Sequence, residues 1–478
     1  MARVLRPFRL VCILSLVALA IASLIVSSSA RPVPQNPPPN PPVGILYVDA
    51  SATGLGTGST WTDAYTSLDS AISAATSGDF ILVADGTYVP TATNGDGFTI
   101  SKSLNIYGGF AGGEASIDTR ARLFDATILL GSTSTTTGRV FTIGGTGSTA
   151  INVVIDGFQI KDGRAASLTA GTLGGGIYAF GSTLTVGNCW FNHDKALSGS
   201  GGGIYITGAF GTPSTLNVKY CRFEGNEVEA KGGAIYGTSI TAGDIVNSLF
   251  DTNFTHFGDG GAVYLDDMTS TAPERFTNCI FWSNYSLGAT AKGGAIEVGT
   301  GSTSGGSAKI VNCTFARNDL SNCGNGTAVN NDLGSACEVH NTIVWLVPAH
   351  CQNGIPVVGV LPGSMTYSCV QYGPQNPLYN LINTDPLFRN VNSPLSLHLL
   401  GPGQAGAANP LGSPCLDYAD KSKLPDDHLD VNGDGLTTNQ TMPVNYLGSI
   451  RDNDWPPPAG NFGVPQGTYV DMGAFEKQ

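Results

Sequence analysis

The residues best suited to bind a metal ion lie near the C-terminus. Asp430, Asn432 and Asp434 alternate with other residues and a glycine follows, a spacing that can wrap oxygen ligands around Ca²⁺. Thr441 stands where the last acidic ligand of a helix–loop–helix calcium site would be, so nearby acids would have to complete the coordination. A structural Ca²⁺ site is one interpretation and a solvated acidic turn is the other. No other cofactor is predicted.

A column of alternating charge is expected from Lys231, Asp259 and Lys292, which precede a Gly-Gly pair in three successive repeats. If the repeats stack, these side chains lie side by side, and exposed ion pairs of this kind contribute about 0–1 kcal/mol each. A polysaccharide lyase would need a basic residue beside Ca²⁺-binding carboxylates for acid–base work on a uronate. Surface pairing is the simpler interpretation, and we assign no catalytic residue.

The cysteines fall into two sets. One set occupies the inward position of the repeat and is expected to form small, buried core thiols: Cys189, Cys221, Cys279, Cys313 and Cys369. Cys323 and Cys351 lie at nearly equivalent loop positions of successive repeats. We therefore predict a Cys323–Cys351 disulfide, which an exported chain permits.

The sequence contains no other recognisable catalytic or metal-binding motif. The six histidines show no metal-ligand spacing, and the chain has no Gly-x-Ser-x-Gly, phosphate-loop or His-Glu-x-x-His motif. Function must therefore be sought in the elements that the repeats build.

Two out-of-phase patterns organise residues 173–318. The first is Gly-Gly-Gly/Ala, then Ile/Val, then an aromatic or polar residue, and successive copies begin 27, 31, 28 and 33 residues apart. Its copies begin at Gly174, Gly201, Gly232, Gly260 and Gly293. The second is Asn-Cys-x-Phe or a close variant, with an Asn three residues after the Phe in most copies. A repeat of this period, rich in β-forming residues, predicts a stacked array.

Each unit holds short apolar runs separated by Gly and Asn and shows no helical period, so one circuit of strands and turns per unit is expected. Circuits stacked about 4.8 Å apart form a parallel β-helix. Equivalent side chains then form ladders: Phe191, Phe223, Phe250, Phe281 and Phe315 inside, and Asn247, Asn278 and Asn312 at a turn. Gly and Asn tolerate the left-handed backbone that such turns use. A β-propeller is the alternative, but its blades are longer and its hairpin turns are not seen.

The composition suits this class and limits the partners. The chain has 478 residues, 64 of them Gly, and only 12% are charged. Its formal net charge is −13, and without residues 1–30, which hold three Arg and no acid, it becomes −16 from 20 basic and 36 acidic residues. This charge argues against nucleic acid, anionic membrane surfaces and uncomplexed polyanions as partners.

Four segments are expected along the chain. Residues 1–30 read as a secretory signal, with Arg residues before an apolar core and small residues at its end; a membrane anchor is the alternative. Residues 31–44 are a Pro-rich linker. Residues 45–384 form the β-helix, with a helix over 63–75, capped by Thr62 or Asp63, closing its open end. Residues 385–478 form an irregular C-terminal cap.

Several short motifs resemble those of one family. Tyr47-Val48-Asp49, Gly86-Thr87-Tyr88, Asp385-Pro386-Leu387-Phe388 and residues 470–476 resemble bacterial secreted choice-of-anchor Q proteins, and the repeats resemble those of polymorphic outer membrane proteins. The resemblance implies a right-handed parallel β-helix, shaped like pectate lyases, in an exported protein. It implies no established activity. It also leads us to expect that Arg451 pairs with Asp471 or Glu476.

The first functional hypothesis is an exported, non-enzymatic β-helix rod outside the cell or on its surface. It would serve in adhesion, glycan binding or envelope and matrix structure, with polysaccharides, other surface proteins or further copies of itself as partners. Neither nucleic acid nor membrane insertion after signal cleavage is expected. The alternative is a polysaccharide lyase or glycoside hydrolase acting in a β-helix groove. Because one scaffold carries both roles, the fold alone does not decide.

Overall fold

The computed structural model describes residues 44–424, with gaps, and the pair Tyr469–Val470. The gaps are 93, 115, 121–125, 132–137, 146, 148, 166–171, 210, 270–271, 302–304, 322, 352–354, 373–379, 389, 395–396, 398, 400–412 and 416–418. Several predictions of the sequence therefore lie outside the described residues: the signal and almost all of the linker, the Asp430, Asn432 and Asp434 site, and the pairing of Arg451 with Asp471 or Glu476.

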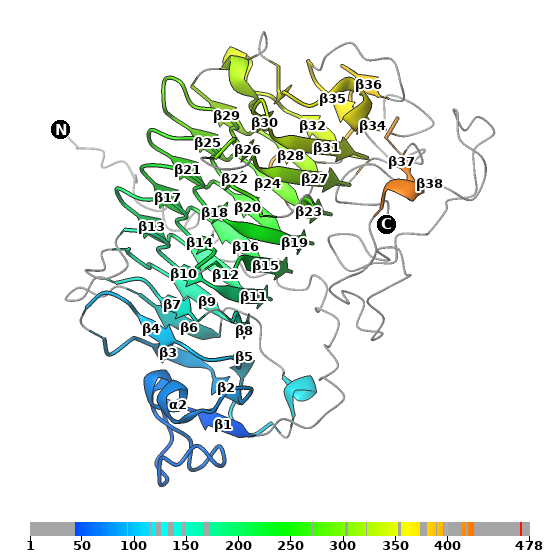
Figure 1. Ribbon diagram of the computed structural model, residues 1–478. Helices are drawn as coiled ribbons and strands as arrows, with labels where there is room; N and C mark the ends of the chain where they lie inside the picture. The colour runs from blue at the N-terminus through cyan, green and yellow to red at the C-terminus, as the bar shows by residue number, and fades with distance from the viewer. Residues whose placement is uncertain are drawn as a thin grey trace, which may run out of the picture.

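Three long parallel sheets and a shorter fourth one make the molecule a right-handed parallel β-helix, as predicted (Figure 1). Sheet 1 consists of β1 (Ile45–Val48), β2 (Phe80–Ala84), β5 (Leu104–Phe110), β8 (Ile151–Asp156), β11 (Ser182–Gly187), β15 (Ser214–Lys219), β19 (Ile240–Val246), β23 (Glu274–Thr277), β27 (Ser307–Val311), β31 (Ala336–His340) and β34 (Met365–Thr366). Sheet 2 consists of β3 (Gly86–Tyr88), β6 (Thr127–Leu130), β9 (Gln159–Lys161), β12 (Trp190–Asn192), β16 (Arg222–Glu224), β20 (Leu249–Asp251), β24 (Ile280–Trp282), β28 (Thr314–Ala316), β32 (Ile343–Trp345), β35 (Cys369–Val370) and β36 (Leu381–Ile382). Sheet 3 consists of β4 (Phe98–Ile100), β7 (Phe141–Gly144), β10 (Ile177–Phe180), β14 (Ile204–Thr207), β18 (Ile235–Thr238), β22 (Val263–Asp266), β26 (Ile296–Val298), β30 (Val329–Asn331) and β33 (Val357–Val358). Sheet 4 is short and consists of β13 (Lys195–Ala196), β17 (Glu227–Val228), β21 (Phe254–Thr255), β25 (Tyr285–Ser286) and β29 (Asp319–Leu320).

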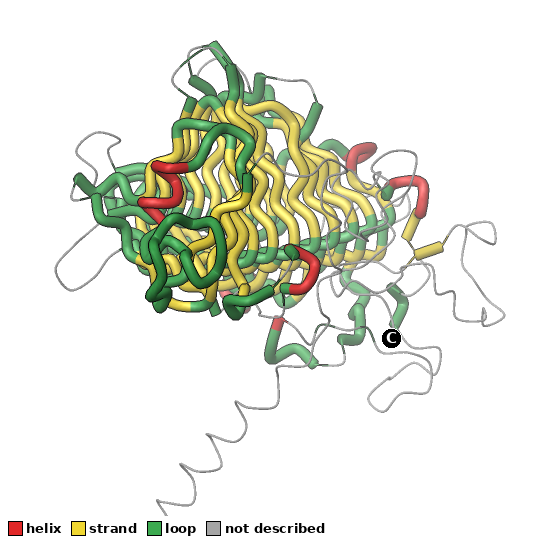
Figure 2. The backbone as a smooth tube through the Cα atoms, turned by 90° about the horizontal axis from the view of Figure 1, so that it is seen from below, coloured by secondary structure: helices red, strands yellow, loops and turns green. Residues whose placement is uncertain are grey.

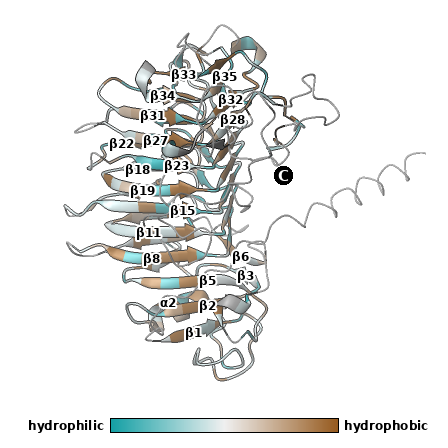
Figure 3. Ribbon diagram, turned by 90° about the vertical axis from the view of Figure 1, so that its right-hand side faces the viewer, coloured by the Kyte–Doolittle hydropathy of each residue, from teal (hydrophilic) through white to brown (hydrophobic). Residues whose placement is uncertain are grey.

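Each complete coil passes through sheet 3, sheet 1, sheet 2 and sheet 4 in that order, as β10, β11, β12 and β13 do. Successive strands lie over one another in register, which Figure 2 shows as nested, nearly parallel lines. Figure 3 shows the strands of sheet 1 as rungs along one side of the molecule. A residue therefore keeps its neighbours from the coils before and after it along the whole stack.

The phenylalanine ladder predicted from the second pattern is present inside the coil. Phe191 stacks on Phe223 with ring centres 4.6 Å apart, and Phe223 on Phe250 at 4.9 Å. The stack continues through Phe281 and Phe315, again at 4.6 Å. All five rings are buried, with at most 1% exposed. Burying each ring stabilises the fold by roughly 1.5–3 kcal/mol, so this column is a main part of the core.

The turn between sheets 1 and 2 uses left-handed backbone at the predicted asparagines. Asn247, Asn278 and Asn312 have φ of 48°, 56° and 55°. Asn278 also donates a 2.9 Å hydrogen bond from its Nδ2 to Oδ1 of Asn247. The first glycine of the other pattern is left-handed too, as Gly232 with φ of 66° illustrates. The second glycine allows close approach of coils, because a Cβ on Gly233 would lie 2.2 Å from the Gly261 carbonyl oxygen.

A short helix closes the N-terminal end, but it is shorter than predicted. Helix α2 spans Leu68–Ala74, and Ser67, not Thr62 or Asp63, is its N-cap. Asp63 is engaged elsewhere, since its Oδ1 accepts a 2.8 Å hydrogen bond from the Leu55 backbone N–H. The apolar face of α2 packs against β1, β2 and β4. Among the described residues, no helix has the length and apolar character needed to span a membrane.

Described parts of the C-terminal segment lie against the outward side of sheet 2. Phe388, Leu397 and Leu399 form a second apolar cluster with outward residues of the last coils, such as Ile280 and Ile343. Short 3₁₀ helices occur along the chain: η1 (Ile117–Thr119), η2 (Cys323–Asn325), η3 (Ala349–Cys351), η4 (Pro362–Ser364) and η6 (Lys421–Lys423). In the C-terminal segment, β37 (Ala419–Asp420) pairs antiparallel with β38 (Tyr469–Val470).

The prediction that the Cys369 side chain points into the coil was wrong. Cys369 pairs in register with Ile343, and Val370 pairs with Val344, so Val370 continues the inward column and Cys369 faces outward into the second cluster. A shift of one residue moves a strand side chain to the opposite face. The other four cysteines of that set, Cys189, Cys221, Cys279 and Cys313, are buried thiols in the main core, as predicted.

Candidate functional site

Four tyrosines on consecutive coils face outward from sheet 3. The strands alternate strictly: in β10, Ile177 and Ala179 are buried, whereas Tyr178 lies half-buried on the outer side. The same position in β14, β18 and β22 holds a tyrosine, and the strand register superposes them. We call these residues, Tyr178, Tyr205, Tyr236 and Tyr264, the tyrosine face.

The rings of the tyrosine face stack along the axis of the coil. Their centres are 5.7 Å apart for Tyr178 and Tyr205, 4.9 Å for Tyr205 and Tyr236, and 5.4 Å for Tyr236 and Tyr264. A cation closes each end: the Arg139 guanidinium lies 5.0 Å from the centre of the Tyr178 ring. At the other end, the ammonium group of Lys231 lies 4.0 Å from the centre of the Tyr264 ring. Because neighbours cover the ring faces, the half-buried Tyr178, Tyr205 and Tyr236 present their edges outward, whereas Tyr264 is only 4% exposed.

Beyond Tyr264, the same column continues with polar side chains. Glu297 follows Tyr264 in register, and Asn330 follows Glu297. Asn330 donates from Nδ2 to Glu297 Oε1 at 3.1 Å and to Asp332 Oδ1 at 3.2 Å. In the neighbouring outward column, Asp266 accepts a hydrogen bond from the Tyr236 hydroxyl at 3.1 Å. The stack of rings thus passes into a cluster of carboxylates and amides.

Burial changes the acidity of this cluster. Glu297 has no exposed surface, and its Oε2 has no hydrogen-bond partner. Burial, reinforced by the nearby Asp332 carboxylate, raises the pKa of Glu297 from 4.5 to about 9. Burial also raises the pKa of Asp266. On the tyrosine face, burial raises the pKa of Tyr205 to about 12, so its hydroxyl stays protonated and can donate a hydrogen bond at neutral pH.

The predicted column of Lys231, Asp259 and Lys292 exists, but the predicted ion pairs along it do not. Backbone bonds place these residues on successive coils. Within the described structure, Lys231 Nζ donates instead to the Tyr264 hydroxyl at 2.7 Å, and Lys292 Nζ pairs with Asp332 at 2.5 Å. Asp259 Oδ1 accepts from the Lys292 backbone N–H at 3.0 Å. Both lysines therefore reach over the outer side of sheet 3, where they become part of the site.

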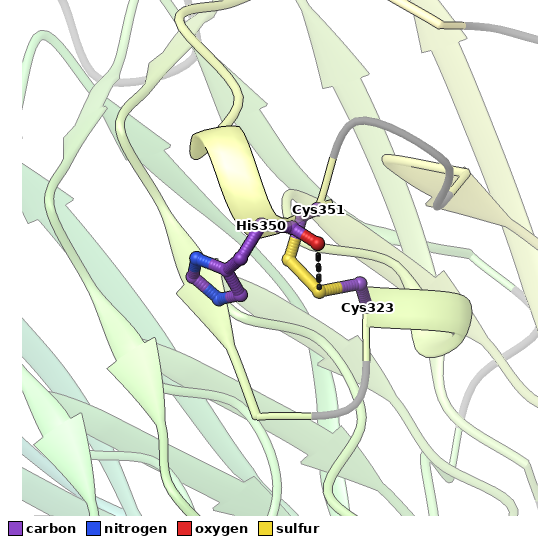
Figure 4. A group of neighbouring side chains, drawn as sticks. All are labelled: Cys323, His350 and Cys351. Atoms are coloured by element: carbon purple, nitrogen blue, oxygen red, sulfur yellow. Dashed lines mark hydrogen bonds between the residues drawn. A yellow bond between two sulfur atoms is a disulfide. The ribbon is translucent and has the colours of Figure 1, made fainter.

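The predicted Cys323–Cys351 disulfide is confirmed, with the two Cα atoms 5.0 Å apart (Figure 4). His350 lies directly before Cys351, and the three side chains are the one group of possible metal ligands found among the described residues. Since both sulfurs are joined to each other, they do not offer thiolates to a metal. The Ca²⁺ ligands proposed from the sequence lie outside the described residues.

One sequence comparison matches part of the repeat. Residues 220–238 match the Chlamydia polymorphic membrane protein repeat. The matched stretch runs from the turn before β16 through β18 and includes one Gly-Gly-Ala-Ile-Tyr copy. No curated protein matches the chain.

Solved structures with similar coils include two lyases and a tailspike. The pectate lyase Pel9A is 14% identical with a TM-score of 0.40, and the match covers 92% of this chain and 97% of that one. A rhamnogalacturonan lyase is 10% identical with a TM-score of 0.37, covering 73% and 91%. The tailspike protein gp49 of Acinetobacter baumannii bacteriophage Fri1, a capsular polysaccharide depolymerase, is 10% identical with a TM-score of 0.33, covering 73% and 66%. At these scores the likenesses carry no argument about function, which must come from the chain's own residues.

The tyrosine face was not predicted from the sequence. The tyrosines stand in the first pattern, but their position was noted only as aromatic or polar. The available signal was the alternation itself: an inward Ile or Val beside a repeated Tyr predicts that the Tyr faces outward. A buried position needs no function to keep an aromatic ring, whereas a repeated outward ring calls for an explanation.

Proposed function

We propose that this chain is an exported, non-enzymatic β-helix protein that binds a neutral polysaccharide along the tyrosine face. The observation that carries the proposal is the register of four outward tyrosines on consecutive coils. Coils repeat about every 4.8 Å, and a polymer of sugar rings is also periodic on the scale of one ring. A chain lying along the axis would therefore meet the phenol hydroxyls of Tyr178 and Tyr205 on adjacent coils, whereas the hydroxyls of Tyr236 and Tyr264 already bond Asp266 and Lys231.

The chemistry of the face suits sugar hydroxyls. Tyr178 and Tyr205 are half-buried, and phenol hydroxyls both donate and accept hydrogen bonds. Thr207 and Thr238 add outward hydroxyl groups in the adjacent column. The net charge of −13 opposes a polyanionic ligand, which supports a neutral polymer as the partner.

Export rests on two separate features. The apolar, Arg-led segment over residues 1–30 reads as a secretory signal. The Cys323–Cys351 disulfide is of the kind that persists in oxidising, extracellular settings. An extracellular or cell-surface location, the choice-of-anchor Q relationship, the Ca²⁺ site and a role in adhesion or matrix structure stay part of the proposal.

The test compares binding of neutral and uronate polysaccharides to the mature chain on a glycan array and by calorimetry. The variant Tyr178→Phe/Tyr205→Phe keeps both rings and removes only two hydroxyls, so the stack should remain. Each lost hydrogen bond is worth about 0.5–1.5 kcal/mol, so affinity should fall roughly tenfold. Tyr107→Phe, on the outer side of sheet 1, is the matched control. An unchanged affinity in the double variant, or the absence of binding to any neutral polysaccharide, would refute the proposal.

Polysaccharide cleavage is a second candidate, favoured by one observation. The ammonium group of Lys231 bonds the Tyr264 hydroxyl next to Asp266 and Glu297, a set that could move protons. However, Tyr264, Asp266 and Glu297 are only 4%, 5% and 0% exposed, and a catalytic acid or base must reach its substrate. Release of cleavage products from neutral or uronate polysaccharides, tested with and without Ca²⁺, would make cleavage the first candidate and binding the second.

A further inference from the structure

We propose that the chain has a second, separate ligand site: a pocket of about 450 Å³ at the edge between sheets 2 and 4 that holds one neutral sugar ring against Tyr285. The pocket is lined by residues from four successive turns of the chain, including Leu287, Arg317, Asp319 and His350. It does not include any residue of the tyrosine face, so it stands whether or not the proposed function does.

The pocket begins where a stack of aromatic rings stops. The outward residues of sheet 4 are superposed by the register, and Phe254, Tyr285 and Asp319 occupy the same position on three consecutive coils. The Phe254 and Tyr285 rings are stacked with centres 4.8 Å apart and planes 7° from parallel. The next coil offers a carboxylate instead of a third ring. Among the described residues no ring stacks on the second face of Tyr285, and the pocket lies beside it.

The carboxylate that ends the stack is held to one side. Asp319 Oδ1 lies 3.0 Å from Nε2 of His350, which is an ion pair when His350 is protonated. The side chain of His350 is 58% exposed and that of Asp319 is 38% exposed, so both polar groups remain available to a ligand. Asp319, which follows Tyr285 in register, and His350 thus form the polar wall of the pocket on the coils after Tyr285.

The disulfide fixes that wall. Cys351 ends η3, directly after His350, and is bonded to Cys323 at the start of η2, one coil earlier. Figure 4 shows the sulfur of Cys323 against the backbone of His350, with Sγ 3.7 Å from its carbonyl oxygen. A covalent link at this point limits the movement of η3. A site that is already ordered loses less entropy when it binds a ligand.

The residues around the pocket match a pyranose ring better than a flat apolar ligand. An aromatic face such as that of Tyr285 packs against the C–H face of a sugar, while the rim offers donors and acceptors to its hydroxyls. Arg317 can only donate hydrogen bonds and Asp319 can accept them, and Ser283 and Ser321 can do both. Arg317 already donates one bond to the Val391 carbonyl and Ser321 donates to the Leu287 carbonyl. An entirely apolar occupant would desolvate the remaining donors and acceptors without supplying partners, which is unfavourable.

Charge argues for a neutral sugar. The Arg317 guanidinium and the Asp319 carboxylate cancel one another, so the lining carries no net charge when His350 is neutral. The chain as a whole is strongly acidic. A uronate would meet Asp319 at the rim and the negative field of the protein on approach, whereas a neutral ring meets neither.

The test uses the mature, disulfide-bonded chain and saturation-transfer NMR with methyl glycosides of neutral hexoses and N-acetylhexosamines. Tyr285→Leu removes the aromatic face but keeps an apolar side chain, and we expect it to weaken binding roughly five- to tenfold. Phe254→Leu is the matched control, because it removes the other ring of the same stack without changing the pocket lining, and it should retain most of the affinity. Tyr178→Phe/Tyr205→Phe should leave this binding unchanged.

Three results would overturn the inference. The first is the lack of transfer to any neutral glycoside. The second is equal loss of binding in Tyr285→Leu and Phe254→Leu. The third is binding of N-acetyltyrosinamide in place of glycosides, which would assign the pocket to an aromatic side chain of a protein partner. If polysaccharide binding at the tyrosine face failed but this binding persisted, only the proposed function would be lost.

Discussion

The ammonium group of Lys231 lies over the ring of Tyr264, 4.0 Å from its centre, and donates a 2.7 Å hydrogen bond to the hydroxyl of the same residue. One side chain therefore closes the tyrosine stack and fixes its last ring. The hydroxyl of Tyr264 also needs the glycine on the next coil, since a Cβ on Gly299 would lie 2.2 Å from that oxygen. The end of the tyrosine face is thus set by residues of three successive coils.

Removing this cation should loosen the end of the stack. Lys231→Met keeps the apolar stem and loses both the cation–π contact and the hydrogen bond, which should lower the free energy of unfolding by about 1–2 kcal/mol. Lys309→Met is the control, because Lys309 makes only a 3.7 Å ion pair with half-exposed Glu338, and it should change stability by less than about 0.5 kcal/mol. Denaturant unfolding followed by tyrosine fluorescence measures both. Equal effects of the two substitutions would contradict the assignment.

Glu297 should make stability fall as pH rises. Its folded-state pKa is about 9 against an ordinary 4.5, so between these pH values the folded chain holds a proton that the unfolded chain releases, and raising the pH favours unfolding. Each pH unit above 4.5 lowers the free energy of unfolding by at most about 1.4 kcal/mol, so the loss due to Glu297 is at most about 4 kcal/mol at pH 7.5. Glu297→Gln should remove this contribution and make the fall of melting temperature between pH 5 and 9 less steep. Glu274, whose pKa burial raises to about 8, still contributes to the fall.

The control for this profile is Glu338→Gln, which changes an exposed carboxylate in sheet 1. It should leave the pH dependence as it is in the unchanged chain. A Glu297→Gln chain whose stability falls as steeply as that of the unchanged chain would show that other groups carry the effect.

Asp194 heads a buried ladder of asparagines and should be replaceable by asparagine with a gain in stability. Asn226 Nδ2 donates to Asn253 Oδ1 at 2.8 Å, and Asn253 donates likewise to Asn284 at 2.9 Å. Asp194 is fully buried, its Oδ2 has no partner, and burial raises its pKa well above the usual range. Asp194→Asn supplies the missing donor, which should stabilise the chain by about 1–3 kcal/mol at pH 7.5.

The reverse substitution provides the comparison. Asn253 accepts a hydrogen bond from Asn226 and donates one to Asn284. Asn253→Asp puts a carboxylate in this buried position and removes the donor to Asn284, so it should destabilise the chain. Thermal unfolding of both variants at pH 7.5 measures the difference. A destabilising Asp194→Asn would mean that the carboxylate has a partner that the ladder geometry does not provide.

Breaking the Cys323–Cys351 disulfide should weaken the last coils. The bond closes a loop of 28 residues, for which the chain-entropy model gives about 3–4 kcal/mol. Because each coil contacts mainly its neighbours, Cys323→Ser/Cys351→Ser should expose β29 to β33 to hydrogen exchange and proteolysis while sheets near β10 stay protected. Uniform loss of protection along the chain would contradict local action.

Iodoacetamide should leave the buried thiols of Cys189 and Cys279 unmodified without denaturant.

The inner ladders could be predicted from the sequence because residue type and period specify them directly. The phenylalanine column and the left-handed asparagines follow from side chains that recur every coil and have few other places to go. Cys369 shows the limit of this reasoning. Near the end of the array the Phe is replaced by Val370, and without the ring to fix the register, the assignment slipped by one residue and reversed the face.

The outer face was harder to predict because its partners belong to other coils. The order of Lys231, Asp259 and Lys292 along the stack was correct, but their partners were not. A lysine side chain is long enough to choose among several acceptors, and the sequence does not say that Asp259 is occupied by a backbone N–H. The Tyr285 pocket could not be seen either, since it depends on where a stack of rings ends and on a disulfide that brings His350 beside it.

The strict register of the coil affects how this protein can evolve. Because buried and half-buried side chains alternate on β10, β14 and β18, each of these strands can exchange an outward residue while its inward residues stay unchanged. Under the proposed function, the binding surface can therefore change one coil at a time, and duplicating or deleting a coil would lengthen or shorten that surface without requiring a new core.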